Sequence, residues 1–330
     1  MEQIALGNSG RLTTRLGFGC SSLMGAMGRR GSLAMLESAF DAGVRHFDVA
    51  PIYGYGEAEG CLGEFLLRHR IEVTVTTKYG IPPAKKSTLL GLGRRVAGPI
   101  LQHVPGLKQR LASVANAVAR NDEKASFTPE QARESLDRSL AALRTDHIDV
   151  WLLHEVEAAN LQDDRLLRFL EGEVEKGTIG TFGIGSGGDK VVELLSQRPA
   201  YCRTLQYEWS VLDAPIPQGE TFRIHHRALT NNFRLLHAAL SQRAEVCQRW
   251  STAVGFDLGR ADDLAHLMLK ASLVMNPDSV VLFSSKRPQH IEANVRAAED
   301  ATLDPAARRL YELVQSEREQ LLPRAEAEAR

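Results

Sequence analysis

Residues 46–78 read HFDVAPIYGYGEAEGCLGEFLLRHRIEVTVTTK, and this stretch decides the fold class. Two short apolar runs, HFDVA (46–50) and VTVTTK (73–78), enclose a segment whose apolar residues recur at helical spacing, 57–69. A strand, a helix and a second strand in this order predict neighbouring parallel strands of one sheet. Asp48 and Lys78 close the two runs, so we expect both charges at the carboxyl edge of that sheet.

The same alternation continues along the chain on both sides of this stretch. Strands are predicted at 15–22, 46–50, 73–78, 148–154, 181–186, 203–209, 222–226 and 279–285, with helices at 32–43, 57–69, from 128, at 165–177, 189–197, about 231–275 and 290–299. A closed (β/α)8 TIM barrel and an open doubly wound sheet both fit such a pattern. Eight repeats without a GxGxxG after the first strand favour the α/β barrel, in a single domain over 1–330.

Three segments lie outside the repeat. Residues 4–14, with the turn 7–10 (GNSG), predict an N-terminal β-hairpin, and the charged tail from about 304 to 330 is helix-prone. About 81–127, after the third strand, is a long insertion rich in Arg and Lys, whereas a βα loop needs only a few residues. It is either a lid over the mouth of the barrel or a surface insertion, and the next helix begins with a capping pattern at Thr128-Pro129.

Composition excludes several classes of protein. The formal net charge is -1 over 330 residues, which gives no global attraction to nucleic acid or to an anionic membrane. No apolar stretch approaches the length of a bilayer span, and the first residues lack the pattern of a signal peptide. The four cysteines are scattered without CxxC spacing, and no cluster of ligands predicts a metal site. We therefore expect a cytoplasmic protein with reduced thiols, and the sequence leaves its oligomeric state open.

Two further reactive side chains accompany Asp48 and Lys78. Tyr53 lies five residues after Asp48, and His154 closes the run IDVWLLH (148–154). Each of the four has an ordinary structural explanation when it is taken singly, such as a buried cap, a packed aromatic or a solvated strand end. A carboxylate, a phenol, an amine and an imidazole that converge at one edge of a barrel predict an acid–base centre instead.

These segments resemble the aldo-keto reductase family. HFDVAPIYGYGEAEGCLGEFL (46–66) resembles the family's signature around an aspartate, a tyrosine and a helix that opens with Gly, Glu and Gly, here Gly56, Glu59 and Gly63. TTKYG (76–80) is similar to its lysine strand, and SLAALRTDHIDVWLLHE (139–155) to its histidine strand. The resemblance covers roughly 3–80 and 128–300. It implies a TIM barrel and an NAD(P)-dependent oxidoreductase.

The resemblance also implies a role for each member of the quartet. Tyr53 would be the general acid/base, Lys78 and Asp48 its tuning pair, and His154 the residue that orients the substrate carbonyl. A free tyrosine titrates near pH ~10, and a neighbouring ammonium is expected to lower this pKa toward the working pH. A carboxylate beside the buried lysine would keep the lysine charged.

The resemblance is weaker at the positions that would hold the nicotinamide. In GIGSGG (183–188) Gly185 and Ser186 occupy the place of the family's Ser-Asn pair, so Ser186 could bond the amide but the asparagine is missing. Gln206 matches the glutamine of the sixth strand. Where most members carry an aromatic that stacks on the nicotinamide, this chain reads RIHHRAL (223–229), so His225 or His226 would have to replace it, unless the pair faces solvent. We predict His225 as the cofactor contact.

The last strand precedes the segment that would hold the phosphates. LFSSKRPQHIEANVRAAE (282–299) is similar to the family's pyrophosphate and ribose segment before a helix, whose N-terminus suits phosphate. The resemblance implies nucleotide contacts from five residues here: Ser284, Ser285, Lys286, His290 and Asn294. His290 stands where an arginine usually grips the 2'-phosphate, and Lys286 or Arg287 could replace that charge. NADP is the expected cofactor, and NAD is the alternative.

The predicted function is reduction of an aldehyde or ketone to an alcohol, or the reverse, with a small-molecule carbonyl or alcohol as substrate. A first alternative is a sugar dehydrogenase that oxidises an aldose to a lactone. A second is a nucleotide-binding regulatory barrel with little turnover, for which the altered nicotinamide positions argue and against which the intact quartet argues.

Overall fold

Eight parallel strands form a closed barrel, as the alternating pattern predicts. The computed structural model describes residues 1–82, 126–214, 219 and 221–321. The strands follow one another round the barrel in chain order, and the last pairs with the first. They are β3 Leu16–Gly19, β4 His46–Asp48, β5 Thr74–Tyr79, β6 Ile148–His154, β7 Ile179–Gly185, β8 Thr204–Glu208, β9 Phe222–His226 and β10 Ser279–Phe283. The open doubly wound sheet is thereby excluded.

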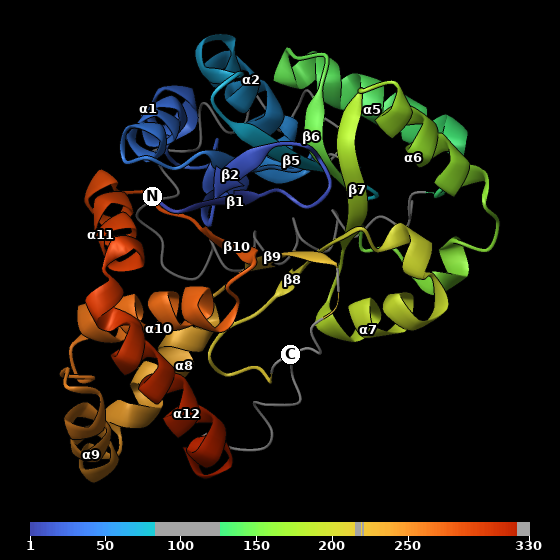
Figure 1. The fold of residues 1–330 in the computed structure, drawn as a ribbon. Helices are drawn as coiled ribbons and strands as arrows, with labels where there is room; N and C mark the ends of the chain where they lie inside the picture. The colour runs from blue at the N-terminus through green and yellow to red at the C-terminus, as the bar shows by residue number, and fades with distance from the viewer. Residues whose placement is uncertain (83–125, 215–218, 220, 322–330) are drawn as a thin grey trace, which may run out of the picture.

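Helices surround the barrel (Figure 1). They are α1 Gly28–Asp41, α2 Ala58–His69, α5 Pro129–Leu143, α6 Arg165–Glu175, α7 Gly188–Gln197, α8 Thr230–Ser241, α9 Ala244–Val254, α10 Ala261–Met275, α11 Pro288–Glu299 and α12 Asp304–Leu321. The predicted helical region 231–275 is three helices. None of the helices in the described part of the chain is both long and apolar enough to cross a membrane.

Local sequence explains how helices begin and how closely they pack. The Thr128 side chain accepts a hydrogen bond from the backbone N–H of Gln131, so the predicted N-cap of α5 is confirmed. A Cβ built on Gly63 would lie 2.3 Å from the carbonyl oxygen of Ala142, because α2 and α5 touch there. This glycine of the signature motif is therefore needed for helix packing.

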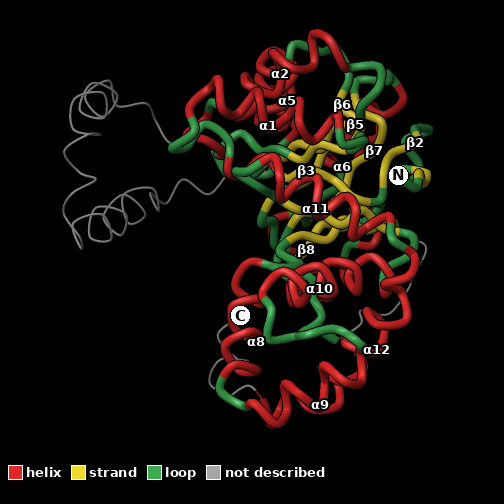
Figure 2. The backbone as a smooth tube through the Cα atoms, turned by 90° about the vertical axis from the view of Figure 1, so that its left-hand side faces the viewer, coloured by secondary structure: helices red, strands yellow, loops and turns green. Residues whose placement is uncertain are grey.

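The predicted hairpin closes the end of the barrel where the strands begin. Its strands β1 (Gln3–Ala5) and β2 (Leu12–Thr14) are antiparallel. Leu6, in the hairpin turn, packs on Val150 and Leu152, and Ile4 packs against a second small cluster inside the barrel. Figure 2 shows the N-terminus and β2 together at this end. The site must therefore open at the other end.

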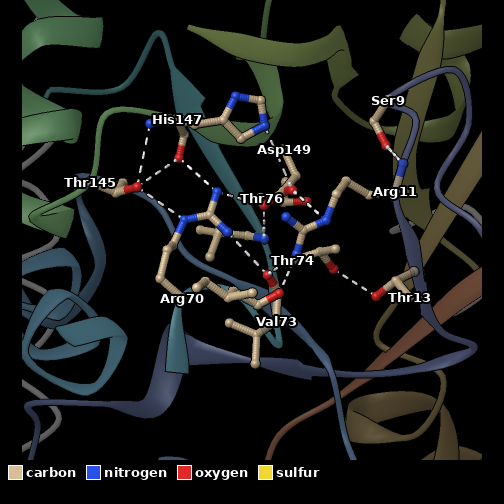
Figure 3. Close-up of polar contacts among 12 residues, drawn as sticks. Ser9, Arg11, Thr13, Arg70, Val73, Thr74, Thr76, Thr145, His147 and Asp149 are labelled. Carbon is tan, nitrogen blue, oxygen red and sulfur yellow. Dashed lines mark hydrogen bonds and ion pairs between the residues drawn. The ribbon is translucent and has the colours of Figure 1, made fainter. Parts of the chain in front are cut away.

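A buried carboxylate organises the same end of the barrel (Figure 3). Asp149 on β6 is fully buried; its Oδ2 accepts from the backbone N–H of Val75 at 2.8 Å and lies 3.0 Å from a guanidinium nitrogen of Arg70. Arg11 and His147 approach its Oδ1 at 3.8 and 3.7 Å. Asp149 and His147 thus join the hairpin, α2 and two strands, which is a structural role.

Among the described residues between β8 and β9 there is no helix, and α12 lies against the segment that follows β8. Gln315 of α12 donates to the carbonyl of Val211 at 2.8 Å, and Arg318 donates to that of Leu212 at 2.9 Å. The tail is therefore packed on the barrel as far as Leu321, while 322–330 and most of the insertion 81–127, including any lid that it forms, lie outside the described residues.

Candidate active site

Four strand-end side chains converge at the carboxyl end of the barrel. Asp48 closes β4, His154 closes β6, and Lys78 lies near the end of β5. Lys78 Nζ donates to both carboxylate oxygens of Asp48, at 2.7 and 2.9 Å, and to the carbonyl of Val49 at 3.0 Å. Both charged side chains are buried, with 2% and 3% exposure. Contact with both oxygens of a carboxylate stabilises the charge of a buried ammonium.

Tyr53 is held over this ion pair by an unusual turn. It begins the short 3-10 turn η2 (Tyr53–Gly56), in which Gly54 and Tyr55 have left-handed backbones, at φ 58° and 60°. A Cβ on Gly54 would lie 2.7 Å from Met24 Cβ, so only glycine fits this turn without displacement. The result places the Tyr53 ring centre 5.2 Å from Lys78 Nζ.

The pKa of Tyr53 does not follow the expected direction. The Lys78 ammonium lowers it, but burial and the negative charge of Asp48 together raise it by more, so the pKa lies above its ordinary 10.0. The pKa of Lys78 is also raised: burial lowers it, and Asp48 and Tyr53 overcome that effect. The expectation that the lysine lowers the tyrosine pKa toward the working pH is therefore wrong, because burial and the charge of Asp48 together outweigh the charge of Lys78.

His154 is a neutral imidazole at physiological pH. Burial lowers its pKa to about 3, and the positive charge of Lys78 and the neighbouring His226 act in the same direction. Its Nδ1 is buried and has no hydrogen-bond partner among the described residues. A neutral imidazole retains one N–H, which can donate to a carbonyl oxygen.

The structure places His226, and not His225, on the inner face of β9. His225 is fully buried on the outer face of the strand, edge-on to Tyr207 with ring centres 4.8 Å apart, so it cannot contact a ligand in the barrel mouth. His226 lies on the inner face with Ile224, and charge interactions with Lys78 place it beside the quartet. His225 therefore does not face the interior of the barrel, as its prediction as a cofactor contact requires, whereas His226 does.

Gln206 and Ser186 lie on neighbouring strands beside Asp48. The Gln206 side-chain amide donates to Asp48 Oδ2 at 2.6 Å. Ser186 follows β7, and its Oγ lies 3.4 Å from the carbonyl of Val156. Gln206 thus joins the ion pair to β8, which the motif comparison did not indicate.

A comparison with known families decides what this arrangement is. The model of the "Aldo/keto reductase family" matches residues 15–240, which include the quartet, Ser186, Gln206 and His226. The chain belongs to the aldo/keto reductase family.

Curated relatives of this aldo/keto reductase are distant. It is 28% identical to pyridoxal 4-dehydrogenase of Microbacterium luteolum over 227 residues, which cover 64% of each protein. It is 32% identical to D-threo-aldose 1-dehydrogenase of a Pseudomonas species over 179 residues, 52% of this chain and 49% of that one. It is 26% identical to L-galactose dehydrogenase of Arabidopsis thaliana over 167 residues, 49% and 40%. The chain thus spans between two fifths and two thirds of the length of these relatives.

Solved structures of aldo/keto reductases share the fold of the whole chain. The holo form of a Bacillus halodurans enzyme superposes with a TM-score of 0.67 at 18% identity, covering 94% of this chain and 96% of that one. A Klebsiella pneumoniae enzyme in complex with NADP and acetate superposes with a TM-score of 0.63 at 17% identity and the same coverage. At this identity the likeness concerns the fold.

The segment expected to hold phosphates lies at the same end of the barrel, outside the stretch that the family model matches. Ser284 donates to the carbonyl of Gly19 at 2.7 Å. Ser285 is buried and forms a turn with Arg287, which precedes α11 and provides no side-chain cap. Lys286 and His290 are exposed, and Asn294 is half-buried. An uncapped helix N-terminus with exposed cations beside it fits a phosphate-bearing nucleotide.

Comparison with the family's motifs did not identify Cys20, which also lies near the site. Cys20 directly follows β3, at the same end of the barrel as the quartet, and is fully buried. Burial raises the pKa of its thiol, and the negative charge of Asp48 raises it further, so the thiol stays protonated. Its place after a barrel strand is the signal that could have identified it. No group of His, Cys, Asp and Glu side chains in the described ranges is arranged to bind a metal ion.

Proposed function

We propose that this aldo/keto reductase interconverts a carbonyl compound and its alcohol with a nicotinamide nucleotide, with Tyr53 as the general acid/base. The observation that carries the proposal is the Asp48–Lys78 ion pair, buried below the phenol of Tyr53 and beside the neutral His154. Such an arrangement has a proton donor, a charge that stabilises its conjugate base, and a hydrogen-bond donor for the substrate oxygen.

In the direction of reduction, the substrate oxygen would lie between the Tyr53 hydroxyl and the His154 N–H. His154 polarises the carbonyl, and Tyr53 transfers its proton to the oxygen as negative charge develops there. Lys78 stabilises the resulting phenolate, and Asp48 holds Lys78 in place. Since the pKa of Tyr53 lies above 10.0, the phenol is protonated at neutral pH, which is the form that reduction requires.

The chain's own residues would hold a nicotinamide nucleotide along the rim of the barrel. When bound, the nucleotide supplies or accepts the hydride. Ser186, Gln206 and His226 would surround the nicotinamide, replacing the expected His225. Ser284, Ser285, Lys286, His290 and Asn294 would hold the phosphates and adenosine, and the exposed Lys286 and Arg287 favour NADP over NAD. The NADP named for the Klebsiella enzyme agrees with this choice.

A second candidate is oxidation of an aldose or another hydroxylated substrate as the main direction. The names of three relatives support it, since each is a dehydrogenase and two are named for sugars. The site chemistry is the same, with Tyr53 acting as the base. We propose that the barrel, hairpin and α12 form one domain that carries this activity.

The test uses the purified full-length protein with NADPH or NADH and a panel of aldehydes and ketones, and in reverse with NADP+ or NAD+ and aldoses at alkaline pH. We expect turnover in at least one direction, and Tyr53→Phe should reduce kcat by at least about a hundredfold. Nucleotide binding without turnover in either direction, or turnover unchanged in the Tyr53→Phe variant, would contradict the proposal.

A further inference from the structure

The turn that carries Tyr53 holds a second tyrosine in a conformation that suits glycine. Gly54, Tyr55 and Gly56 follow one another with φ of 58°, 60° and 84°. This left-handed region is rare for a residue with a bulky side chain, whereas the two neighbours are the glycines that such a turn normally uses. An outlier of this kind often marks a functional site.

The turn itself does not need the side chain of Tyr55. Two hydrogen bonds between backbone groups close it. The N–H of Tyr53 donates to the carbonyl of Ala50 at 3.0 Å, and the N–H of Glu57 donates to the carbonyl of Gly54 at 3.3 Å. A glycine at position 55 would keep both bonds. Tyr53 packs against the hydrophobic core, whereas Tyr55 is not among the described residues that do so and is 56% exposed.

Tyr55 lies at the end of the barrel where a ligand would bind. The large apolar side chains that are exposed in the described part of the chain are Leu12, Tyr55, Leu67, Ile71 and Val192. Leu12 belongs to the hairpin, and Leu67 and Ile71 lie where α2 leads back to the closed end. Val192 lies on α7, outside the barrel. Tyr55 is the one in a loop after a barrel strand, two residues from the proposed acid/base.

The neighbouring loop holds this turn in place. Met24, in the loop after β3, is also left-handed, at φ 60°, and its backbone N–H donates to Ser32 Oγ at 2.8 Å. A Cβ built on Gly54 would meet Met24 Cβ at 2.7 Å and the carbonyl oxygen of Leu23 at 2.9 Å, so the two loops are in close contact. A side chain on a turn fixed in this way is positioned before a ligand arrives, which lowers the cost of binding.

We propose that Tyr55 is a substrate-contact residue, whose ring packs on the part of the substrate that does not react, and that the substrate is a carbonyl compound or alcohol that carries a ring. This rests on the proposed function, because it concerns the substrate of that same site. A carbonyl group that reaches Tyr53 leaves the rest of its molecule at the rim, where Tyr55 is exposed. A flat ring in the substrate can stack on the tyrosine, whereas a short open chain cannot.

Four variants separate the ring of Tyr55 from its backbone. Tyr55→Gly removes the ring and the steric strain, Tyr55→Ala removes the ring and keeps the strain, and Tyr55→Phe keeps the ring. Arg144→Gly is the matched control, because Arg144 follows α5 at the closed end with φ 54°. Since glycine suits a left-handed backbone, we expect Tyr55→Gly to melt about 2 °C above Tyr55→Ala.

The probes are benzaldehyde and propanal, reduced with NADPH or NADH. Benzyl alcohol and 1-propanol replace them if the protein only oxidises, and D-galactose and D-glyceraldehyde if it accepts only sugars. The measured quantity is kcat/KM for the ring-bearing probe divided by kcat/KM for the open-chain probe. We expect this ratio to fall about fivefold to tenfold in Tyr55→Gly and Tyr55→Ala, and to stay within about twofold in Tyr55→Phe and Arg144→Gly.

An unchanged ratio in Tyr55→Gly and Tyr55→Ala would overturn the inference; an equal loss with both probes would mean that Tyr55 only shapes the turn around Tyr53. A fall in Tyr55→Phe as large as in Tyr55→Ala would also overturn it, because the hydroxyl and not the ring would be responsible. A Tyr55→Gly variant that melts below Tyr55→Ala would reject the argument from the backbone. All of these results leave the proposed function intact. No turnover with any probe contradicts that function and takes the inference with it.

Discussion

A buried carboxylate lies at each end of this barrel, and the two carboxylates have different partners. At the end closed by the hairpin, two arginines, a histidine and a backbone N–H surround Asp149. At the open end, Asp48 meets only Lys78 and Gln206 among the described side chains, and the nearby His154 Nδ1 has no partner there. Asp149 Oδ1 also lacks a hydrogen-bond partner among the described residues, although Arg11 and His147 lie within 4 Å of it. The closed end thus places four groups around its carboxylate, whereas two described side chains meet Asp48 at the open end.

Backbone strain divides between the ends in the same way. Within the described ranges, six residues other than glycine have positive φ, and five of them follow the carboxyl end of a strand: Met24, Tyr55, Glu155, Arg227 and Thr230. Left-handed backbones of this kind cost roughly 1 to 3 kcal/mol each. Most of these residues therefore lie near the site, with Glu155 and Arg227 directly after His154 and His226, and Arg144 is the one at the other end.

Of these variants, Lys78→Met should give the largest losses of activity and stability. It would also reduce the difference between the two ends, since each would then depend on its carboxylate for stability. It removes the charge that stabilises the Tyr53 phenolate and leaves Asp48 buried without its cation. We expect kcat to fall by about a hundredfold to ten-thousandfold and stability to fall by about 3 kcal/mol. Steady-state kinetics and urea denaturation measure the two losses. The control Tyr53→Phe should share the kinetic loss and keep the stability, and a stable Lys78→Met variant would show that the ion pair matters little for folding.

Asp149→Ala changes the closed end alone, so it should lower stability without lowering activity. It leaves Arg70 and the N–H of Val75 without their buried acceptor, so we expect a loss of about 3 kcal/mol in the free energy of unfolding. The kcat of the folded fraction should stay within about twofold, since the catalytic groups lie at the other end of the strands. Asp149→Asn, which keeps an acceptor, should lose less stability, and a large change in kcat in either variant would mean that the two ends are coupled.

The pH dependence of turnover tests the charge balance of the open end. Because the pKa of Tyr53 is raised, the phenol should remain protonated through neutral pH, and reduction should decline only at strongly alkaline pH. Oxidation, which needs the phenolate, should rise with pH over the same range. His154, with its pKa lowered to about 3, should add no acidic limb near neutral pH. Profiles of kcat in both directions measure this, and an oxidation plateau near neutral pH would show a lowered tyrosine pKa in the working complex.

His226→Phe should have the smallest effect. A phenyl ring covers a stacked nicotinamide at least as well as an imidazole, so we expect the Kd for the nucleotide to change by less than about tenfold, toward tighter binding. His225→Phe is the matched control on the outer face of β9 and should leave the Kd unchanged. A change in Kd from the His225 variant alone would reverse the assignment of the two faces.

The spacing of apolar residues along the chain predicted the barrel and the position of the quartet, because strand ends and helical periodicity depend on neighbouring residues. The family resemblance, which the family model confirms over 15–240, added roles that stay predictions. Two results needed the folded chain. The choice between His225 and His226 depends on which face of β9 turns inward, and the pKa of Tyr53 depends on a sum of burial and the opposing charges of Lys78 and Asp48. The contact of α12 with the segment 209–213 joins residues about a hundred positions apart, beyond any local pattern.

The contact of α12 with the segment 209–213 has a consequence for how the protein is made. Tyr311, Gln315 and Arg318 lie against this segment, so it stays uncovered until α12 has left the ribosome. A nascent chain that has completed all eight strands would still expose Trp209 and its neighbours. We expect chaperones to bind this intermediate, and chains that end before residue 304 to aggregate during synthesis rather than accumulate as a shortened barrel.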